Sequence, residues 1–360
     1  MKIYLQYPWK FPDSPYYKSL ISFPPKEIYY QNIEKQKNII TNKQFFFFSN
    51  FLKKNIRKCA NISKLYIPNS HSSPQGDYDV IHCCHCLSNN NKPWVCDIEM
   101  MSSFSISEMD NENIKGKIKS ILLSKNCKKI MPWSESVKKD ILKSYPEIEN
   151  KVEVVYPAIP ESKELKRIKN NKMKIIFIAR YFDIKGGLIA LEVLERLRSK
   201  YDIDGIVVST VPTKLKKKYH KLKIYDLMSS EKLFKLMEES DLFLYPSSID
   251  TFGFSLLEAM AFGLPIITIN TSMTKSRREI VKNGKTGFIF NVDKKLLFNK
   301  IEDKEEQVIK KLIENTYKLI KDKKLRKRMS EECIKTIKEG KFSIKERNKK
   351  LKMIYKEALI

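Results

Sequence analysis

The sequence predicts an α/β protein of two domains, each built on a doubly wound parallel sheet. The 360 residues fit two domains at roughly 100–200 residues each. Short apolar runs rich in β-branched and aromatic residues alternate with segments of helical period. Pro157 and Pro160, followed by the Lys-rich stretch 162–172, interrupt this alternation and mark a linker. We therefore expect a first domain over residues 1–158 and a second one from residue 159.

Each domain is expected to have six strands. Those of the first domain are Lys2–Gln6, Leu65–Pro68, Asp79–His82, Trp94–Ile98, Lys129–Pro132 and Val152–Tyr156. Those of the second are Lys174–Ala179, Ile203–Val208, Leu222–Tyr225, Asp241–Tyr245, Pro265–Ile269 and Gly287–Phe290. Ligands of open parallel sheets bind at the carboxyl ends of the strands, so we expect the functional residues on the loops that follow strands.

Helices are expected between most of these strands. In the first domain Ser134 is a candidate N-cap for a helix that runs to Leu142. The second domain is expected to form helices over Gly187–Leu197, Glu231–Glu239, Phe254–Phe262 and Lys294–Ile301, and residues 304–360 are expected to be helical and highly charged.

The composition excludes several classes of protein. With 42% hydrophobic residues, 11% aromatic residues and only 10 Gly and 15 Pro, the chain is neither disordered nor collagen-like. It has no run of about 18 apolar residues, and its N-terminus starts as a strand and not as a leader, which predicts a soluble, cytoplasmic protein. Seven cysteines form no even framework, so reduced thiols are expected.

The net charge of +27, from 69 Lys+Arg against 42 Asp+Glu, has two interpretations. It is typical of proteins that bind nucleic acid, anionic lipid or a phosphorylated small molecule. Alternatively, the abundance of Lys, Asn and Ile reflects an AT-rich genome. Because the lysines are spread along the whole chain and form no recognised nucleic-acid motif, a nucleic acid is not an expected partner.

The most informative segment, residues 245–268, places two carboxylates around the start of a helix. A strand ends at Pro246, a loop carries Asp250 and Gly253, and the helix that begins near Phe254 contains Glu258. A helix N-terminus offers free N–H groups and about half a positive charge, which suits a phosphate, while carboxylates suit the hydroxyls of a sugar. Acids in this position are also ordinary capping residues, so the pattern alone leaves both interpretations open.

This segment resembles the signature of glycosyltransferase family 4, retaining enzymes of GT-B fold that use nucleotide sugars. The matching residues are Pro246, Ser247, Phe252, Gly253, Glu258, Ala259, Met260, Ala261, Gly263 and Pro265. Asp250 stands where the family usually has the first of two glutamates. The resemblance implies two Rossmann-like domains facing across a cleft, with the C-terminal domain over residues 159–340 and a helix over 341–360 that crosses back to the N-terminal domain.

A second resemblance lies upstream, in the segment I-F-I-A-R-Y-F-D-I-K-G over residues 176–186. It is similar to the family's strand-ending motif and implies that Arg180, Lys185 and Gly186 hold the diphosphate of the donor, whose developing charge two cations stabilise without a metal. In the first motif, the resemblance implies that Glu258 binds the ribose. Asp250 and the backbone around Gly253 are expected at the transferred sugar, and the whole donor-binding set is Arg180, Lys185, Gly186, Phe252, Gly253, Phe254 and Glu258.

The segment over residues 279–288 also resembles the family, with one difference. The Gly pair that normally precedes the glutamate at position 279 is replaced by residues 274–277. Because that loop usually meets the donor in this family, the donor contacts there are expected to differ.

The acceptor side is expected on the first domain. Residues 78–82 resemble a family strand that ends at His82, and the chain has Asp97 and Glu99 where members often carry an active-site histidine. Asp250, Glu258 and Glu99 are the candidate catalytic carboxylates, with His82, Asp97 and Glu99 on the acceptor side. Glu99 could equally cap the following loop. The Gly-rich loop expected after the first strand is missing, because Gly76 is the first glycine of the chain.

Two further features of the first domain have competing interpretations. His82, Cys83, Cys84, His85, Cys86 and Cys96 suggest zinc, yet adjacent residues of a strand point to opposite faces and no second ligand pair completes a site, so we expect buried thiols and no metal. The aromatic run between Lys43 and Lys54 fits either a core helix or a helix at a membrane interface. The second interpretation makes an anionic membrane surface a candidate partner, with peripheral association at the cytoplasmic face.

The expected function is thus a retaining glycosyltransferase that moves a hexose-type sugar from a nucleotide-diphosphate sugar to a glycan or lipid-linked acceptor. We expect no cofactor other than this co-substrate, and no metal. The alternatives are a GT-B relative with altered or lost activity, such as an epimerase-like enzyme or a non-catalytic subunit, and a basic nucleic-acid-binding protein.

Overall fold

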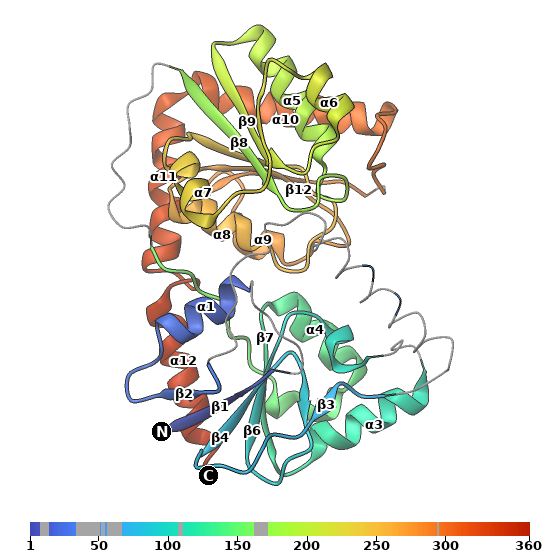
Figure 1. The fold of residues 1–360 in the computed structure, drawn as a ribbon, viewed down its shortest axis with the longest axis vertical. Coiled ribbons are helices and arrows are strands. Elements are labelled where there is room, and N and C mark those ends of the chain that lie inside the picture. The colour runs from blue at the N-terminus through green and yellow to red at the C-terminus, as the bar shows by residue number, and fades with distance from the viewer. Residues whose placement is uncertain are drawn as a thin grey trace. The chain divides into compact units, whose positions relative to one another are not determined.

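The structure is a computed structural model that describes residues 1–7, 14–33, 51, 55, 67–106, 111–161, 172–293 and 295–360. The chain divides into two compact units (Figure 1). The first contains Met1–Ala158 together with Ile344–Ile360, and the second contains Ile159–Ser343. Both units are built on parallel sheets, as the sequence predicts.

The main sheet of the first unit has the strand order β2-β1-β4-β6-β7, and every pairing is parallel. Its strands are β1 (Lys2–Gln6), β2 (Tyr29–Gln31), β4 (Val80–Cys84), β6 (Trp94–Ile98) and β7 (Cys127–Pro132). A small second sheet pairs β3 (Ser70–His71) with β5 (Leu87–Ser88). All residues of β4 and β6 are buried, which explains why these segments read as continuous runs instead of alternating ones.

The helices described in the first unit are α1 (Pro15–Ser22), α3 (Glu112–Leu123), α4 (Glu135–Ser144) and α12 (Ile344–Glu357), with short 3₁₀ turns η1 (Met101–Phe104) and η2 (Pro146–Lys151). The predicted cap of α4 is confirmed, because the Ser134 side chain accepts a hydrogen bond from the backbone N–H of Val137. α12 packs in this unit although it is the last element of the chain.

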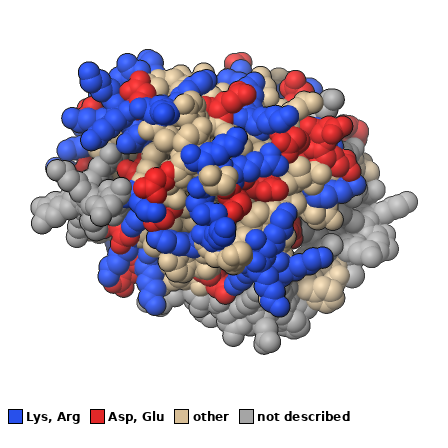
Figure 2. All heavy atoms as spheres, turned by 90° about the horizontal axis from the view of Figure 1, so that it is seen from above, with Lys and Arg blue, Asp and Glu red and all other residues tan. Residues whose placement is uncertain are grey.

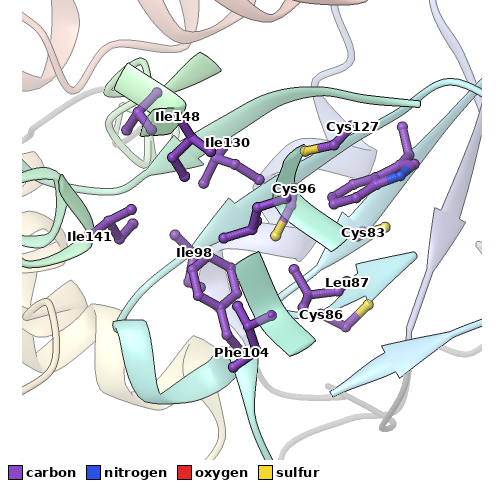
Figure 3. Close-up of a cluster of buried hydrophobic side chains, with 14 of the residues drawn as sticks. Cys83, Cys86, Leu87, Cys96, Ile98, Phe104, Cys127, Ile130, Ile141 and Ile148 are labelled. Atoms are coloured by element: carbon purple, nitrogen blue, oxygen red, sulfur yellow. The ribbon is translucent and has the colours of Figure 1, made fainter. Parts of the chain in front are cut away.

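The core of the first unit includes several thiols (Figure 3). Cys83 and Cys96 lie opposite each other on β4 and β6 and are fully buried with Ile98, Phe104 and Ile130. Burial raises the pKa of the Cys83 and Cys96 thiols, so they are neutral and pack as small apolar groups. Within the part of the chain that the structure describes, no group of three His, Cys, Asp or Glu side chains could hold a metal ion.

The second unit has a six-stranded parallel sheet of order β10-β9-β8-β11-β12-β13. Its strands are β8 (Met173–Ala179), β9 (Ile203–Ser209), β10 (Lys223–Tyr225), β11 (Leu242–Tyr245), β12 (Ile266–Asn270) and β13 (Gly287–Asn291). Renumbered within the unit, this order is 3-2-1-4-5-6, the doubly wound arrangement whose direction reverses between the first and fourth strands, here β8 and β11.

Seven helices are described in the second unit: α5 (Gly187–Lys200), α6 (Thr213–Lys218), α7 (Ser230–Glu238), α8 (Phe254–Ala261), α9 (Arg277–Ile280), α10 (Asp303–Lys321) and α11 (Lys323–Lys338). α10 packs against α5 and α11 packs against α8. Across the described ranges, no helix combines the length and apolar content needed to cross a bilayer.

Two predicted elements are wrong. Residues 152–156 form no strand: Glu153 and Val155 donate to carbonyls of β7, but the Val154 carbonyl accepts from the Lys350 ammonium, so no further ladder forms. The helix expected from residue 294 is also absent over residues 295–301, and α10 starts at Asp303, where Glu302 and Glu305 form a capping box.

Some expectations fall on residues that the structure does not describe. Of the predicted strand at 65–68, Pro68 forms a single bridge to Ser105, and residues 65 and 66 lie outside the described ranges. The aromatic run over 43–54 lies outside them too, apart from Phe51, so its membrane interpretation stays a prediction. The linker segment 162–171 is likewise outside.

Candidate functional site

The two motifs of the second unit meet at the point where its strand order reverses. β8 and β11 are adjacent and parallel, with Ile176 opposite Phe243. Their carboxyl ends therefore lie at the same edge of the sheet, and the loops over 180–186 and 246–253 lead from that edge into α5 and α8. The predicted donor-binding residues come from these loops and from the first two turns of α8.

Lys185 and Asp250 are in direct contact across these loops. The Lys185 ammonium lies 2.9 Å from Oδ1 of Asp250 and donates to the backbone carbonyl of Ile249 at the same distance. The two side chains are only 17% and 11% exposed, so the pair is screened from water more than a surface ion pair is. Two residues that the sequence placed in separate motifs thus form one ion pair.

Glycines allow the two loops to approach this closely. Gly186 precedes α5 with a φ of 76°, and a Cβ at this position would lie 2.5 Å from the carbonyl oxygen of Pro246. Gly253 precedes α8 with a φ of 109°. Both positions need the left-handed conformation that glycine adopts without strain. Two helix N-termini, those of α5 and α8, consequently start at one edge of the sheet, and each carries the partial positive charge of its helix dipole.

Asp250 is held by several donors besides Lys185. The hydroxyl of Tyr245 donates to Oδ2 at 3.0 Å, and the backbone N–H of Thr251 donates to Oδ1 at 3.1 Å. Burial raises the pKa of Tyr245, so its hydroxyl keeps its proton and remains a donor. Nη2 of Arg277 lies 3.4 Å from Oδ2. The carboxylate therefore has a fixed orientation.

Arg277 is a site residue that sequence reasoning missed. It is the first residue of α9, its side chain is fully buried, and it donates to the backbone carbonyls of Ser247 and Ile269. Burial lowers the pKa of the Arg277 guanidinium, and the charge of Asp250 offsets part of this effect. A signal was present, because residue 277 belongs to the segment that replaces the expected Gly pair.

The other donor-side candidates lie on the same loops and helix. Arg180 follows the last residue of β8 and is half-buried, and the Thr210 hydroxyl donates to its carbonyl at 3.4 Å. Phe252 is buried with its ring against those of Phe254 and Phe342. Glu258, in the second turn of α8, is half-buried. Together with Lys185, Gly186 and Gly253, these residues complete the predicted donor-binding set at this edge: Arg180, Phe252, Phe254 and Glu258. Phe252 packs the loop.

The acceptor-side candidates lie in the first unit, where two of them are fully buried. Nε2 of His82 lies 3.5 Å from Oδ1 of Asp97, and the Asp97 carboxylate accepts hydrogen bonds from the Tyr17 hydroxyl at 2.9 and 3.0 Å. Trp133 Nε1 also donates to Asp97, at 3.3 Å. Glu99 follows β6 and is half-buried. His82 and Asp97 thus share an internal network, and Glu99 alone of the three is partly accessible.

The charge state of Asp97 follows from this network. Burial alone would raise the pKa of its carboxyl, but the nearby imidazoles of His82 and His85 and the hydrogen bond from Tyr17 outweigh it. The pKa of Asp97 is therefore lowered, and the group is a carboxylate at neutral pH.

Comparison with known proteins identifies the second unit. Residues 158–336 match the family model of glycosyl transferases group 1. The chain carries a group 1 glycosyltransferase domain. Its matched segment coincides closely with the unit Ile159–Ser343 and contains Arg180, Lys185, Asp250 and Glu258.

The chain is also similar to one sequence relative and to several solved structures. The chain is 29% identical over 157 residues to an uncharacterized 41.2 kDa protein in the cps region of Klebsiella pneumoniae, a match that covers 40% of this chain and 42% of that protein. Among solved structures, HepE of Anabaena in complex with UDP-glucose superposes with a TM-score of 0.59 at 13% identity, covering 98% of each chain. WaaG, a glycosyltransferase involved in lipopolysaccharide biosynthesis, superposes with a TM-score of 0.59 at 15% identity. This match covers 98% of the present chain and 99% of WaaG. At these sequence identities the similarity shows the fold alone. The fold of this chain is that of the GT-B glycosyltransferases.

Proposed function

We propose that the protein is a retaining glycosyltransferase that transfers a hexose-type sugar from a nucleotide-diphosphate sugar to a glycan or lipid-linked acceptor. The observation that carries this proposal is the contact of Lys185 with Asp250 between the N-termini of α5 and α8. It brings a cation, a carboxylate and the positive ends of two helix dipoles to one edge of the glycosyltransferase domain. Such a set suits a ligand that has both phosphates and hydroxyls.

The donor's diphosphate would be bound by Arg180, Lys185 and the backbone at Gly186. As the bond between sugar and phosphate breaks, negative charge grows on the leaving diphosphate, and the positive charge of these donors stabilises it and lowers the barrier. This positive charge is why we propose that the reaction needs no metal ion and no other cofactor.

The sugar and ribose would be bound by the carboxylates. Asp250 and the Phe252–Gly253 backbone would orient the transferred sugar, Glu258 would bind the ribose hydroxyls, and Phe254 would lie beside the donor. Carboxylates accept hydrogen bonds from vicinal hydroxyls, so these contacts give orientation. We propose that the leaving phosphate helps to deprotonate the acceptor on the same face of the sugar, which retains configuration without a protein nucleophile.

The acceptor side rests on fewer observations. Of the three acceptor-side candidates, Glu99 is the one that is partly accessible, and we propose that it contacts the acceptor or the sugar hydroxyls. His82 and Asp97 would contribute to the acceptor side indirectly, through the buried network that joins them to Tyr17 and Trp133. The lipopolysaccharide role of WaaG and the cps region of the Klebsiella relative support a glycan or lipid-linked acceptor.

A location in the cytoplasm, with peripheral association at the membrane face, follows from a lipid-linked acceptor and from the net charge of +27. Figure 2 shows Lys and Arg spread over the visible face with Asp and Glu among them, and not gathered into one patch. This distribution supports a general attraction to anionic surfaces and gives no support to a nucleic-acid groove.

The proposal is tested by thermal unfolding of the full chain with UDP, GDP, ADP and TDP and their common sugar conjugates, each with EDTA. A ligand at 100 times its dissociation constant stabilises by about 2.7 kcal/mol, roughly 5–10 °C for domains of this size. We expect one nucleotide to raise the melting temperature and Glu258→Gln to lose that shift. Glu331→Gln, an exposed carboxamide substitution on α11, is the matched control and should keep it.

The opposite outcomes are equally informative. A shift that survives in Glu258→Gln would contradict the assignment of Glu258 to the ribose. No shift with any nucleotide at millimolar concentration would contradict donor binding and favour a GT-B relative that has lost its activity. Product analysis by NMR then decides between retention and inversion of the anomeric configuration.

A further inference from the structure

The side chain of Arg277 connects the start of the loop that carries Asp250 to Asp250 itself. It donates to the carbonyl of Ser247 at the start of the loop and lies 3.4 Å from Asp250 near its tip. It also donates to the carbonyl of Ile269, at 2.8 Å, which fixes the loop to β12. One buried guanidinium therefore connects β12, the loop and the carboxylate.

The neighbouring loop is bound to the same structure. The Thr271 hydroxyl donates to the Ser248 carbonyl at 2.7 Å, and the Ser276 hydroxyl donates to the Thr251 carbonyl at 3.3 Å. The loop that precedes α9 thus follows the Asp250 loop along its length. Arg277 lies at the end of this contact, where only a long side chain with several donors reaches both backbone carbonyls and the carboxylate.

Asp250 meets its two cations on different oxygens, and the cations differ in freedom. Lys185 contacts Oδ1 through a flexible stem and is 17% exposed, whereas Arg277 contacts Oδ2 and is 1% exposed. Carbonyls on two sides hold Arg277 in place. A largely buried carboxylate that loses its only counter-charge is strongly disfavoured. With Arg277 present, Asp250 stays paired even when Lys185 turns away.

We infer that Arg277 is a positioning residue of the donor site, which holds the Asp250 carboxylate so that Lys185 can turn its ammonium to the diphosphate of the sugar nucleotide. The inference rests on the proposed function, because it takes the diphosphate as the ligand of Lys185. Arg277 itself touches no substrate in this scheme. Arg277 holds Asp250, and this leaves Lys185 able to bind the donor. Its effect on the affinity for the donor is therefore indirect.

The first test needs no ligand. The unfolding equilibrium constants of wild type, Asp250→Asn, Arg277→Gln and the double variant are measured in urea, with Arg278→Gln as the control. Arg278 is the next residue, exposed and bonded to Asn291. We expect the unfolding equilibrium constant of the double variant to differ by about tenfold or more from the value that the two single substitutions would give if their effects were independent. Additivity within about twofold would overturn the inference. Arg277→Lys, which keeps the charge, replaces Arg277→Gln if that variant does not fold.

The second test measures nucleotide binding by calorimetry, with whichever of UDP, GDP, ADP and TDP binds the wild type most tightly. We expect Arg277→Gln to weaken binding at least tenfold, Arg277→Lys to restore part of it, and Arg278→Gln to leave it unchanged. In a Lys185→Met background, Arg277→Gln should weaken nucleotide binding by no more than about twofold, because Arg277 affects binding only through Lys185.

The outcomes distinguish the positioning role of Arg277 from the proposed function of the protein. An equal loss in the Lys185→Met background would mean that Arg277 acts by general stabilisation, which would overturn the positioning role. Failure of every nucleotide to bind the wild type would instead contradict the proposed function, and with it the donor role of Arg277, while the urea cycle still decides whether Arg277 and Asp250 are coupled.

Discussion

The hydroxyl of Tyr355 lies 2.6 Å from Nδ1 of His82, 273 residues earlier in the chain. The same hydroxyl lies 3.1 Å from that of Tyr30. From the same helix, Arg347 donates to the Ser19 hydroxyl at 2.8 Å. These buried polar contacts join α12 to β4, β2 and α1, so the last helix is fixed to the first unit by specific partners as well as by apolar packing.

Removing the Tyr355 hydroxyl should destabilise the first unit. Tyr355→Phe removes a hydrogen-bond partner of the buried Nδ1 of His82 and of the Tyr30 hydroxyl. We expect the free energy of unfolding, measured in urea, to fall by about 1 to 3 kcal/mol. Tyr29→Phe, at a side chain that is 68% exposed, should change stability by less than about 0.5 kcal/mol. Equal stabilities for the two variants would show that the contact does not hold α12.

A methyl group at position 186 should damage the donor site. Gly186→Ala places its Cβ 2.5 Å from the Pro246 carbonyl oxygen and is strained at a φ of 76°, so the loop must shift. We expect at least tenfold weaker nucleotide binding by calorimetry. Gly116→Ala in α3, where a Cβ meets nothing within 4 Å, should leave binding unchanged and gain up to about 1 kcal/mol in stability. Unaltered binding in Gly186→Ala would show that this loop does not contact the ligand.

Asp97 should stabilise the first unit in a pH-dependent way. Its pKa is lower in the folded than in the unfolded chain, so its stabilising contribution is present above the ordinary aspartate value of about 3.9 and is lost as the pH falls through the folded value. We expect Asp97→Asn to be less stable than wild type at pH 7 and the difference to shrink below about pH 4. Urea unfolding from pH 7 to pH 3 measures it, with the exposed Asp226→Asn as control. A difference that grows toward low pH would contradict the prediction.

Activity should survive chelation. Because Lys185 and two helix N-termini supply positive charge at the site, we expect kcat/KM to stay within about twofold in EDTA once a donor and an acceptor are known. Lys185→Met should lower kcat by about a hundredfold. Lys327→Met, at an exposed position of α11, should have no effect. Strict dependence on Mg²⁺ or Mn²⁺ would show that a metal ion takes the part assigned to Lys185.

Segments with a strong local pattern were predicted well. β1, β6 and β8 lie within one residue of their expected bounds, because buried parallel strands need apolar, β-branched runs. β2 and α6 were missed, since three to six residues are too few to show a period. The strand expected over 152–156 failed for another reason. A strand exists only if a neighbour pairs with it, and the Val154 carbonyl binds Lys350 instead.

The sequence by itself determined the alternation of strands and helices, the two motifs and hence the family of the second unit, because periodicity and residue spacing are local properties. Only the tertiary structure decided which charges meet. It paired Lys185 with Asp250 across 65 residues, placed the Arg277 guanidinium against the same carboxylate, and buried Asp97 against His82. The physical reason is that a charge contact depends on distance in space and on exclusion of water, and both arise only when parallel strands align their carboxyl ends.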